Sequence, residues 1–364
     1  MKKHLFAITW SMVFVMVITS CKKEGTNTNT SVKNLATLGL YQYSSGTSKR
    51  LFIPITKVGT QTVNYYTVFD TGSSGLTLDA TGIIPASMIT SNGIQVNGDS
   101  VNVNGITITS KELVMSFGDA TNLTKEYGNL AYATFTIGDA NGNIGTKRIP
   151  FFLYYKIMNE VTNTKLPAHS ADVMGVGPGT SYASTLIASP LSYFDVGANL
   201  TKGFRLATLN ASSFTSAGNY VAGLLSIGLT PVDKATSTGF IMHPLTYSTS
   251  AGYSPNIPAT ITYNGTTTSA QVLFDTGNPS QTIIENTKET NAIGNLPPNS
   301  TVKVVTNMGF TYTYTTTSTS YLTTIQNPNN TNDYRTIFSL DFFIDNEYLT
   351  DYTNHEIGLK NGTP

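Results

Sequence analysis

Cysteine is nearly absent from this chain of 364 residues, and the single one, Cys21, lies close to the N-terminus. The folded part therefore cannot contain an intramolecular disulfide, so a large hydrophobic core must stabilise it. Charged residues are also scarce, at 12% of the chain, whereas Thr, Ser, Asn, Gly and Tyr are plentiful. This composition favours twisted antiparallel sheets with many turns over helices, and the expected fold class is all-β.

Neither sign of charge is in excess. The chain has 21 basic and 21 acidic residues, and the acidic ones lead by two once Lys2 and Lys3 of the N-terminal leader are set aside. A surface of this kind does not attract nucleic acid or an anionic membrane by charge. We therefore expect no nucleic-acid partner.

Histidine is scarce as well, and its four positions, 4, 169, 243 and 355, do not have the spacing of metal ligands. The glycine-rich stretch 175–181 lacks the lysine of a phosphate-binding loop. Asp139 begins a stretch that resembles a calcium loop, but Ile144 and Pro150 occupy its sixth and twelfth positions, which favours a hairpin turn. The sequence thus predicts no metal and no cofactor.

The N-terminus has the features of a targeting segment. Two lysines precede an apolar run that ends at Ile18 and is short for a membrane span. Small residues then precede Cys21, a pattern that resembles the bacterial lipoprotein signal. It implies a signal peptide at 1–20, lipid on Cys21, and a protein anchored to a membrane of the cell envelope, facing the periplasm or the exterior. An uncleaved membrane anchor with an incidental cysteine is the alternative.

Residues 21–35 are polar and lack a periodic apolar face, which predicts a flexible tether. Beyond it, strand-like segments are expected at 51–55 and 61–69, joined as a hairpin, and at 112–118 and 127–138, joined as a longer hairpin. The stretch 149–155 is apolar enough to be a central strand. We divide this folded part into an N-terminal lobe, 36–198, and a C-terminal lobe, 199–364.

The most informative pattern is an apolar strand that stops at an acid and then turns through glycines. It occurs at Asp70-Thr71-Gly72-Ser73 and again, 205 residues later, at Asp275-Thr276-Gly277-Asn278. Each acid loop is followed far downstream by two apolar residues and a small one, ending at Gly175 and at Ser339. This repeated order indicates an internal duplication that places one acid in each lobe.

The ordered set of motifs resembles the pepsin-like aspartic proteases over about residues 50–360. The resemblance implies a bilobal acid protease fold, with two homologous β-barrel-like lobes and a central cleft. It implies an endopeptidase that hydrolyses an extended peptide or protein through a water activated by two carboxylates. It further implies a monomer that needs no cofactor.

The resemblance also assigns the site residues. Asp70 and Asp275 are the catalytic pair, with Ser73 hydrogen-bonded to the outer oxygen of Asp70. Phe117 and Gly118 belong to a substrate-binding flap. The residues that support the catalytic loops are Thr71, Gly72, Ser73, Thr276, Gly277 and Asn278, and those of the ψ-shaped crossing loops are Gly175 and Ser339.

Four positions depart from the family pattern. Asn278 replaces a Thr or Ser, and its amide is expected to donate to Asp275 instead. Phe117 replaces the flap tyrosine, Thr77 replaces the tryptophan that bonds the hydroxyl of that tyrosine, and Ser339 replaces a glycine. These departures favour the alternative, a catalytically inactive pepsin-fold binding protein on the cell surface. A glycan-binding surface protein is a third reading.

Overall fold

The computed structural model describes residues 32–118, 123–289 and 294–362. The expected signal peptide, Cys21 and the tether up to residue 31 lie outside the described residues. Val32–Pro364 forms one compact unit. No helix in the described ranges is long and apolar enough to cross a membrane.

Strands dominate the described residues, which confirms the all-β expectation. In the first half they are β1 (Ala36–Ser45), β2 (Ser48–Val58), β3 (Gln61–Asp70), β4 (Ser74–Asp79), β5 (Ile89–Thr90), β6 (Gly93–Ile94), β7 (Ser100–Val103), β8 (Ile106–Phe117), β9 (Thr124–Ala133), β10 (Phe135–Asp139), β11 (Gly142–Gly145), β12 (Ile149–Asn159), β13 (Thr164–Lys165) and β14 (Val173–Val176).

The second half continues with strands and two short α-helices. Its elements are β15 (Thr201–Leu206), β16 (Asn219–Leu229), β17 (Ile241–Pro244), β18 (Tyr247–Ser248), β19 (Gly252–Tyr253), β20 (Ile257–Tyr263), β21 (Thr266–Phe274), β22 (Thr282–Glu285), β23 (Thr301–Thr306), β24 (Thr311–Thr315), β25 (Thr323–Gln326), α1 (Pro328–Thr331), β26 (Arg335–Phe338), α2 (Leu340–Asp345), β27 (Asn346–Asp351) and β28 (Glu356–Asn361).

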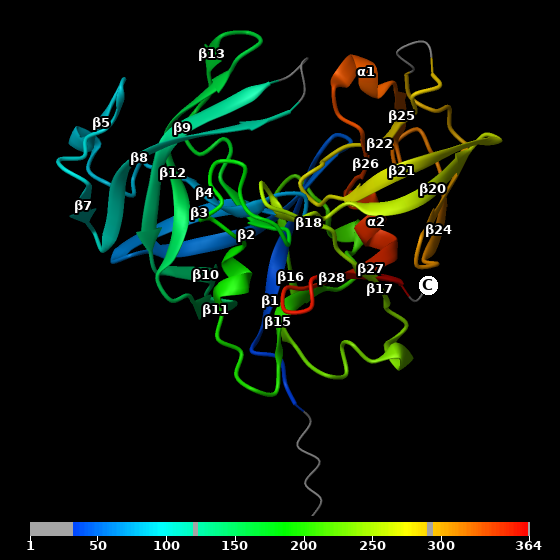
Figure 1. Ribbon diagram of the computed structural model, residues 1–364, viewed down its shortest axis with the longest axis horizontal. Helices are drawn as coiled ribbons and strands as arrows, with labels where there is room; N and C mark the ends of the chain where they lie inside the picture. The colour runs from blue at the N-terminus through cyan, green and yellow to red at the C-terminus, as the bar shows by residue number, and fades with distance from the viewer. Residues whose placement is uncertain (1–31, 119–122, 290–293, 363–364) are drawn as a thin grey trace, which may run out of the picture. The chain divides into compact units, whose positions relative to one another are not determined.

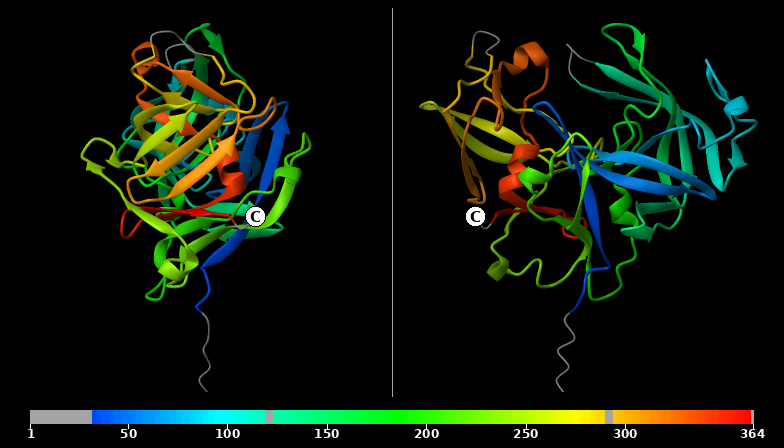
Figure 2. Two further views of the ribbon diagram at one scale, coloured as in Figure 1. Left: turned by 90° about the vertical axis from the view of Figure 1, so that its right-hand side faces the viewer. Right: turned by 180° about the vertical axis from the view of Figure 1, so that it is seen from behind.

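Two large sheets give the molecule two lobes. A seven-stranded sheet, ordered β24-β23-β20-β21-β26-β22-β25, belongs wholly to the second half. The larger, 17-stranded sheet contains β2 to β4 and the β8–β9 hairpin of the first half, and it also takes in β15 to β17, β27 and β28. In Figure 1 the strands β8, β9 and β12 lie on one side, β20 to β22 on the other, and β1, β15 and β16 between them, as the view from behind in Figure 2 repeats.

The same crossing pattern occurs in both lobes, as expected for a duplication. In the first lobe β14 runs parallel to β3, with Gly175 opposite Asp70, and antiparallel to β4. In the second lobe β26 runs parallel to β21, with Phe338 opposite Phe274, and antiparallel to β22. Each acid therefore lies at the end of a strand, β3 or β21, that pairs with the crossing strand of its lobe.

The predicted hairpins are present, with two differences. The long hairpin begins earlier, at Ile106, because Ile106 and Ile108 are buried in the core. The segment expected to form one strand at 127–138 is two strands, β9 and β10, that meet at Thr134. The break occurs where the chain stops pairing with β8 and β12 and begins to pair with β2.

Buried phenylalanines anchor both acid loops. Phe69, directly before Asp70, packs edge-on against Phe204 with ring centroids 5.7 Å apart. Phe274, directly before Asp275, packs against Phe342 of α2 at 4.2 Å. Burying a side chain of this size contributes roughly 1.5–3 kcal/mol, so the hydrophobic core fixes the residues from which both carboxylates project.

Candidate active site

The structure brings Asp70 and Asp275 into contact, although they are 205 residues apart in the chain. A β-carbon built on Gly72 would lie 2.4 Å from Asp275 Cγ, and one built on Gly277 would lie 2.7 Å from Asp70 Cγ. Real β-carbons do not approach other atoms so closely. Each motif therefore needs glycine at its third position, because the backbone of each loop packs against the acid of the other.

The two threonines cross-link the loops symmetrically. Thr71 N donates to Thr276 Oγ1 at 3.0 Å, and Thr276 N donates to Thr71 Oγ1 at 3.0 Å. Each threonine hydroxyl also donates to a backbone carbonyl of the opposite loop. Thr71 Oγ1 donates to the carbonyl of Phe274, and Thr276 Oγ1 donates to that of Phe69. All four bonds are buried. They hold the two lobes in register at the acids, and their loss would leave buried polar groups unpaired.

The hydrogen bonds to the two carboxylates are unequal. Asp70 accepts from Gly72 N at 2.7 Å and Ser73 N at 3.2 Å on one oxygen, and from Ser73 Oγ at 2.5 Å on the other. In the described part of the chain, Gly277 N, at 2.7 Å, is the one backbone donor to the carboxylate of Asp275. Donated hydrogen bonds stabilise a carboxylate, so this asymmetry favours charge on Asp70.

Asp275 has the opposite tendency. Burial raises its pKa well above the usual value for an aspartate, and the charge of Asp70 and a hydrogen bond between the two side chains raise it further. Two carboxylates this close do not both ionise readily and titrate as a pair. Burial and the smaller number of donated hydrogen bonds thus favour the protonated form of Asp275, a preference that the sequence alone does not show.

Asn278 does not support Asp275 in the expected way. Its Nδ2 donates to the carbonyl of Gln281 at 2.8 Å, within its own loop, rather than to the carboxylate. The cause is the turn that follows, which brings the Gln281 carbonyl within reach of the amide. Ser339, at the start of α2, is 1% exposed, and its hydroxyl oxygen has no hydrogen-bond partner in the part of the chain that the structure describes.

Gly175 lies directly behind the first acid loop. A β-carbon there would come within 2.7 Å of Ser73 Oγ and 2.8 Å of Ser74 N. Gly177, in the stretch weighed as a phosphate loop, packs just as closely on the carbonyl of Ser73. The glycines of this segment are thus needed to let β14 pass close to the Asp70 loop.

The residues expected to form the flap lie at the end of the β8–β9 hairpin. Phe117 pairs with Thr124, its side chain is 40% exposed, and Gly118 has a positive φ of 85°. Thr77 lies elsewhere, buried in β4 between β12 and β14. The remaining tip residues, 119–122, lie outside the described residues.

Lys49 and Arg50 on β2 contact the second acid loop, although no sequence motif pointed to them. Arg50 Nη1 donates to the carbonyl of Gly277 at 2.8 Å, and Lys49 N donates to that of Pro279 at 2.7 Å. Lys49 Nζ also forms a 2.6 Å ion pair with Asp341 of α2. A strand of the first lobe therefore contacts the acid loop of the second lobe at two carbonyls. No local sequence signal marks these contacts.

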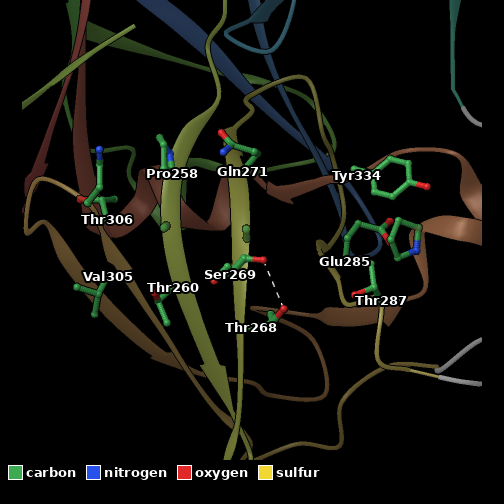
Figure 3. A pocket seen from close by; sticks show the side chains of 14 residues that line it. Pro258, Thr260, Thr268, Ser269, Gln271, Glu285, Thr287, Val305, Thr306 and Tyr334 are labelled. Atoms are coloured by element: carbon green, nitrogen blue, oxygen red, sulfur yellow. Dashed lines mark hydrogen bonds between the residues drawn. The ribbon is translucent and has the colours of Figure 1, made fainter. Parts of the chain in front are cut away.

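Two other features bear on the chemistry. No group of three or more His, Cys, Asp or Glu in the described residues could hold a metal ion. A groove of about 510 Å³ lies over β20 and β21 and contains no acid pair, since Glu285 is the one acid among its lining residues (Figure 3). The groove therefore does not provide the two-carboxylate chemistry.

Comparisons with known proteins bear on the fold. No protein-family model and no curated protein matches the sequence. Among solved structures, the chain is similar to the aspartic proteinase from Irpex lacteus. The match has 17% identity and a TM-score of 0.55, and it covers 89% of this chain and 97% of that one. At this identity the likeness shows the fold, and the chain accordingly has the bilobal, all-β fold of a pepsin-like aspartic proteinase.

Proposed function

We propose that the protein is an aspartic endopeptidase. The observation that supports this most directly is the contact between Asp70 and Asp275, with three donated hydrogen bonds on the first acid and a raised pKa on the second. A binding protein has no need for two carboxylates held against each other, which is a costly arrangement. Perturbed titrating groups of this kind are typical of catalytic sites.

In the proposed mechanism a water binds between the two carboxyl groups. Ionised Asp70 takes a proton from this water, which attacks the carbonyl carbon of the scissile peptide bond. Protonated Asp275 donates its hydrogen to the carbonyl oxygen, where negative charge develops. The resulting diol collapses as Asp70 passes its proton to the leaving amide nitrogen and a diol hydroxyl returns a proton to Asp275, so no covalent enzyme intermediate forms.

The proposed substrate is an extended stretch of peptide or protein. Such a segment can pair with strand edges through its main chain, and its side chains then determine specificity. The exposed ring of Phe117 at the end of β8 offers an apolar contact from the flap. It cannot donate the hydrogen bond that a tyrosine would give, so we expect the flap to hold substrate by packing alone.

The test uses soluble protein that begins just after Cys21, incubated with a diverse peptide mixture from acid to neutral pH. Asp70→Asn and Asp275→Asn are the matched variants, and each should lower cleavage by at least about a hundredfold because acid–base catalysis is lost. Thermal melting checks that each variant is folded. Folded wild-type protein that cleaves nothing at any pH would instead indicate an inactive binding protein.

A further inference from the structure

Arg50 lies beside the acid pair but is not part of either motif. It occupies β2 of the first lobe, and its guanidinium donates to Gly277 of the second lobe at 2.8 Å. The N–H of that same glycine donates to Asp275, and its α-carbon faces Asp70 so closely that an added β-carbon would meet the carboxyl group. One residue thus connects Arg50 to both acids.

The charge of Arg50 also acts on the pair. Its side chain is half-buried, and burial lowers its pKa, while the charges of Asp70 and Asp275 both oppose that shift. An arginine stays protonated throughout the range in which carboxylates titrate. The acid pair therefore has a permanent positive charge nearby, in a partly desolvated position where screening by water is reduced.

Other support for Asp275 is limited. The charge of Arg335 lowers its pKa, but Asn278 donates to Gln281 rather than to the carboxylate, and the Ser339 hydroxyl has no partner among the described residues. The Thr71–Thr276 bonds fix the residue before Gly277, and a further constraint on Gly277 itself helps to hold it against both acids. Arg50 supplies one from outside the loop, through a hydrogen bond to a backbone carbonyl that uses a charged donor and is therefore a strong one.

We propose that Arg50 is a positioning residue of the acid pair, which holds the Asp275 loop through the Gly277 carbonyl and favours the ionised states of the pair through its charge. Its effect on catalysis rests on the proposed function, whereas its effect on the carboxyl groups does not. A cation favours the loss of each proton from the pair, so its removal should move both titration steps to higher pH.

The decisive experiment follows the two carboxyl carbons by NMR as a function of pH, in wild-type protein and three variants. Arg50→Met removes both the charge and the donor, and Arg50→Gln removes the charge but keeps an N–H donor. Lys57→Met, an exposed lysine on the same strand, controls for the loss of one positive charge. The Asp70→Asn and Asp275→Asn proteins assign the two signals.

We expect both titration steps to move up by about one pH unit in Arg50→Met and Arg50→Gln, the low end of the effect of a neighbouring cation. Lys57→Met should titrate like the wild type. Should Arg50→Met fail to fold, Arg50→Gln still tests the charge. Titration curves of folded Arg50→Gln that coincide with the wild type would overturn the inference.

Kinetics distinguish the effect of the Arg50 hydrogen bond, which positions Gly277, from the effect of the Arg50 charge. If the protein cleaves peptides, both limbs of the pH profile should shift upward in the two neutral variants. kcat should fall about tenfold in Arg50→Met and less in Arg50→Gln, with KM nearly constant. A shifted titration without cleavage by any form supports the role of Arg50 and rejects the protease. Cleavage with an unshifted titration rejects the role of Arg50 alone.

Discussion

Glu126 is a buried acid outside the acid pair. It lies on β9, fully shielded from solvent, and neither carboxylate oxygen has a hydrogen-bond partner within the described ranges. Burial raises its pKa well above the usual value, and the nearby charges of Asp172 and Asp79 raise it further. We expect Glu126 to keep its proton in the folded protein at pH values at which it is already ionised in the unfolded chain.

This difference makes stability depend on pH. Below about pH 4.3 both states hold the proton and Glu126 has no effect, but above it the unfolded chain gains by ionising. Relative to the wild type, Glu126→Gln should therefore become more stable as pH rises, by up to roughly 1.4 kcal/mol per pH unit until the folded pKa is reached. Denaturant unfolding at pH 4, 5, 6 and 7 measures this difference.

Glu112→Gln is the matched control, since Glu112 is an exposed acid on the adjacent strand β8. It removes the same charge without a buried carboxyl group and should leave the pH dependence of stability unchanged. If Glu126→Gln behaves like this control, the buried carboxyl does not retain its proton on folding.

At the residue scale the sequence predicted the two acids but not their surroundings. Asp70 and Asp275 stand in a local pattern of strand, acid and glycine that a reader can find in the chain. The roles of Arg50 and Glu126 depend on distant neighbours, the carbonyl of Gly277 in one case and Asp172 in the other. No short motif contains that information.

At the scale of secondary-structure elements, an ion pair joins β2 to α2. Lys49 and Asp341 form a 2.6 Å ion pair in which both side chains are largely buried, and Asp341 also accepts from Tyr321 N at 2.6 Å. Lys49→Met would leave a buried carboxylate without its cation. We expect a loss of about 3–5 kcal/mol in the free energy of unfolding, measured by denaturant titration.

A double variant shows whether the cost comes from the unpaired charge. Lys49→Met combined with Asp341→Leu removes both charges, and it should be more stable than Lys49→Met alone. A loss below about 1 kcal/mol in the single variant would mean that water reaches Asp341 and that the pair behaves like one at the surface.

The strands were predicted well where polar and apolar residues alternate or where an apolar run lies between two turns. The β2–β3 hairpin and the β8–β9 hairpin followed from such runs around glycines. The division of 127–138 into β9 and β10 could not be read locally, because it depends on the exchange of partner strands at Thr134. Pairing between elements far apart in sequence is decided by tertiary packing.

At the scale of the whole molecule, the largest sheet joins both ends of the chain. β1 pairs with β16, and β15 pairs with β27, so residues near 40, 220 and 350 share one sheet. The sequence predicted two lobes from the repeated acid loops, and the structure has them. The sequence showed no sign of the shared strands, whose partner residues are separated by 142 residues or more in the chain.

The compact unit Val32–Pro364 begins after the only cysteine of the chain, and this permits a test of the proposed lipid anchor. Cys21 precedes the described residues, so Cys21→Ala should leave the melting temperature of the folded unit unchanged. With lipid on Cys21, the wild-type protein made in a bacterial host should enter the detergent phase on partitioning, because each buried methylene adds about 0.8 kcal/mol of membrane affinity.

The mass of the wild-type protein should show loss of residues 1–20 and addition of acyl chains, and Cys21→Ala should carry no acyl chains. An uncleaved anchor gives a different result, since the wild-type protein would then keep its leader and carry no acyl chains. The apolar run that ends at Ile18 would in that case hold the protein in the membrane, and Cys21 would have no part in it.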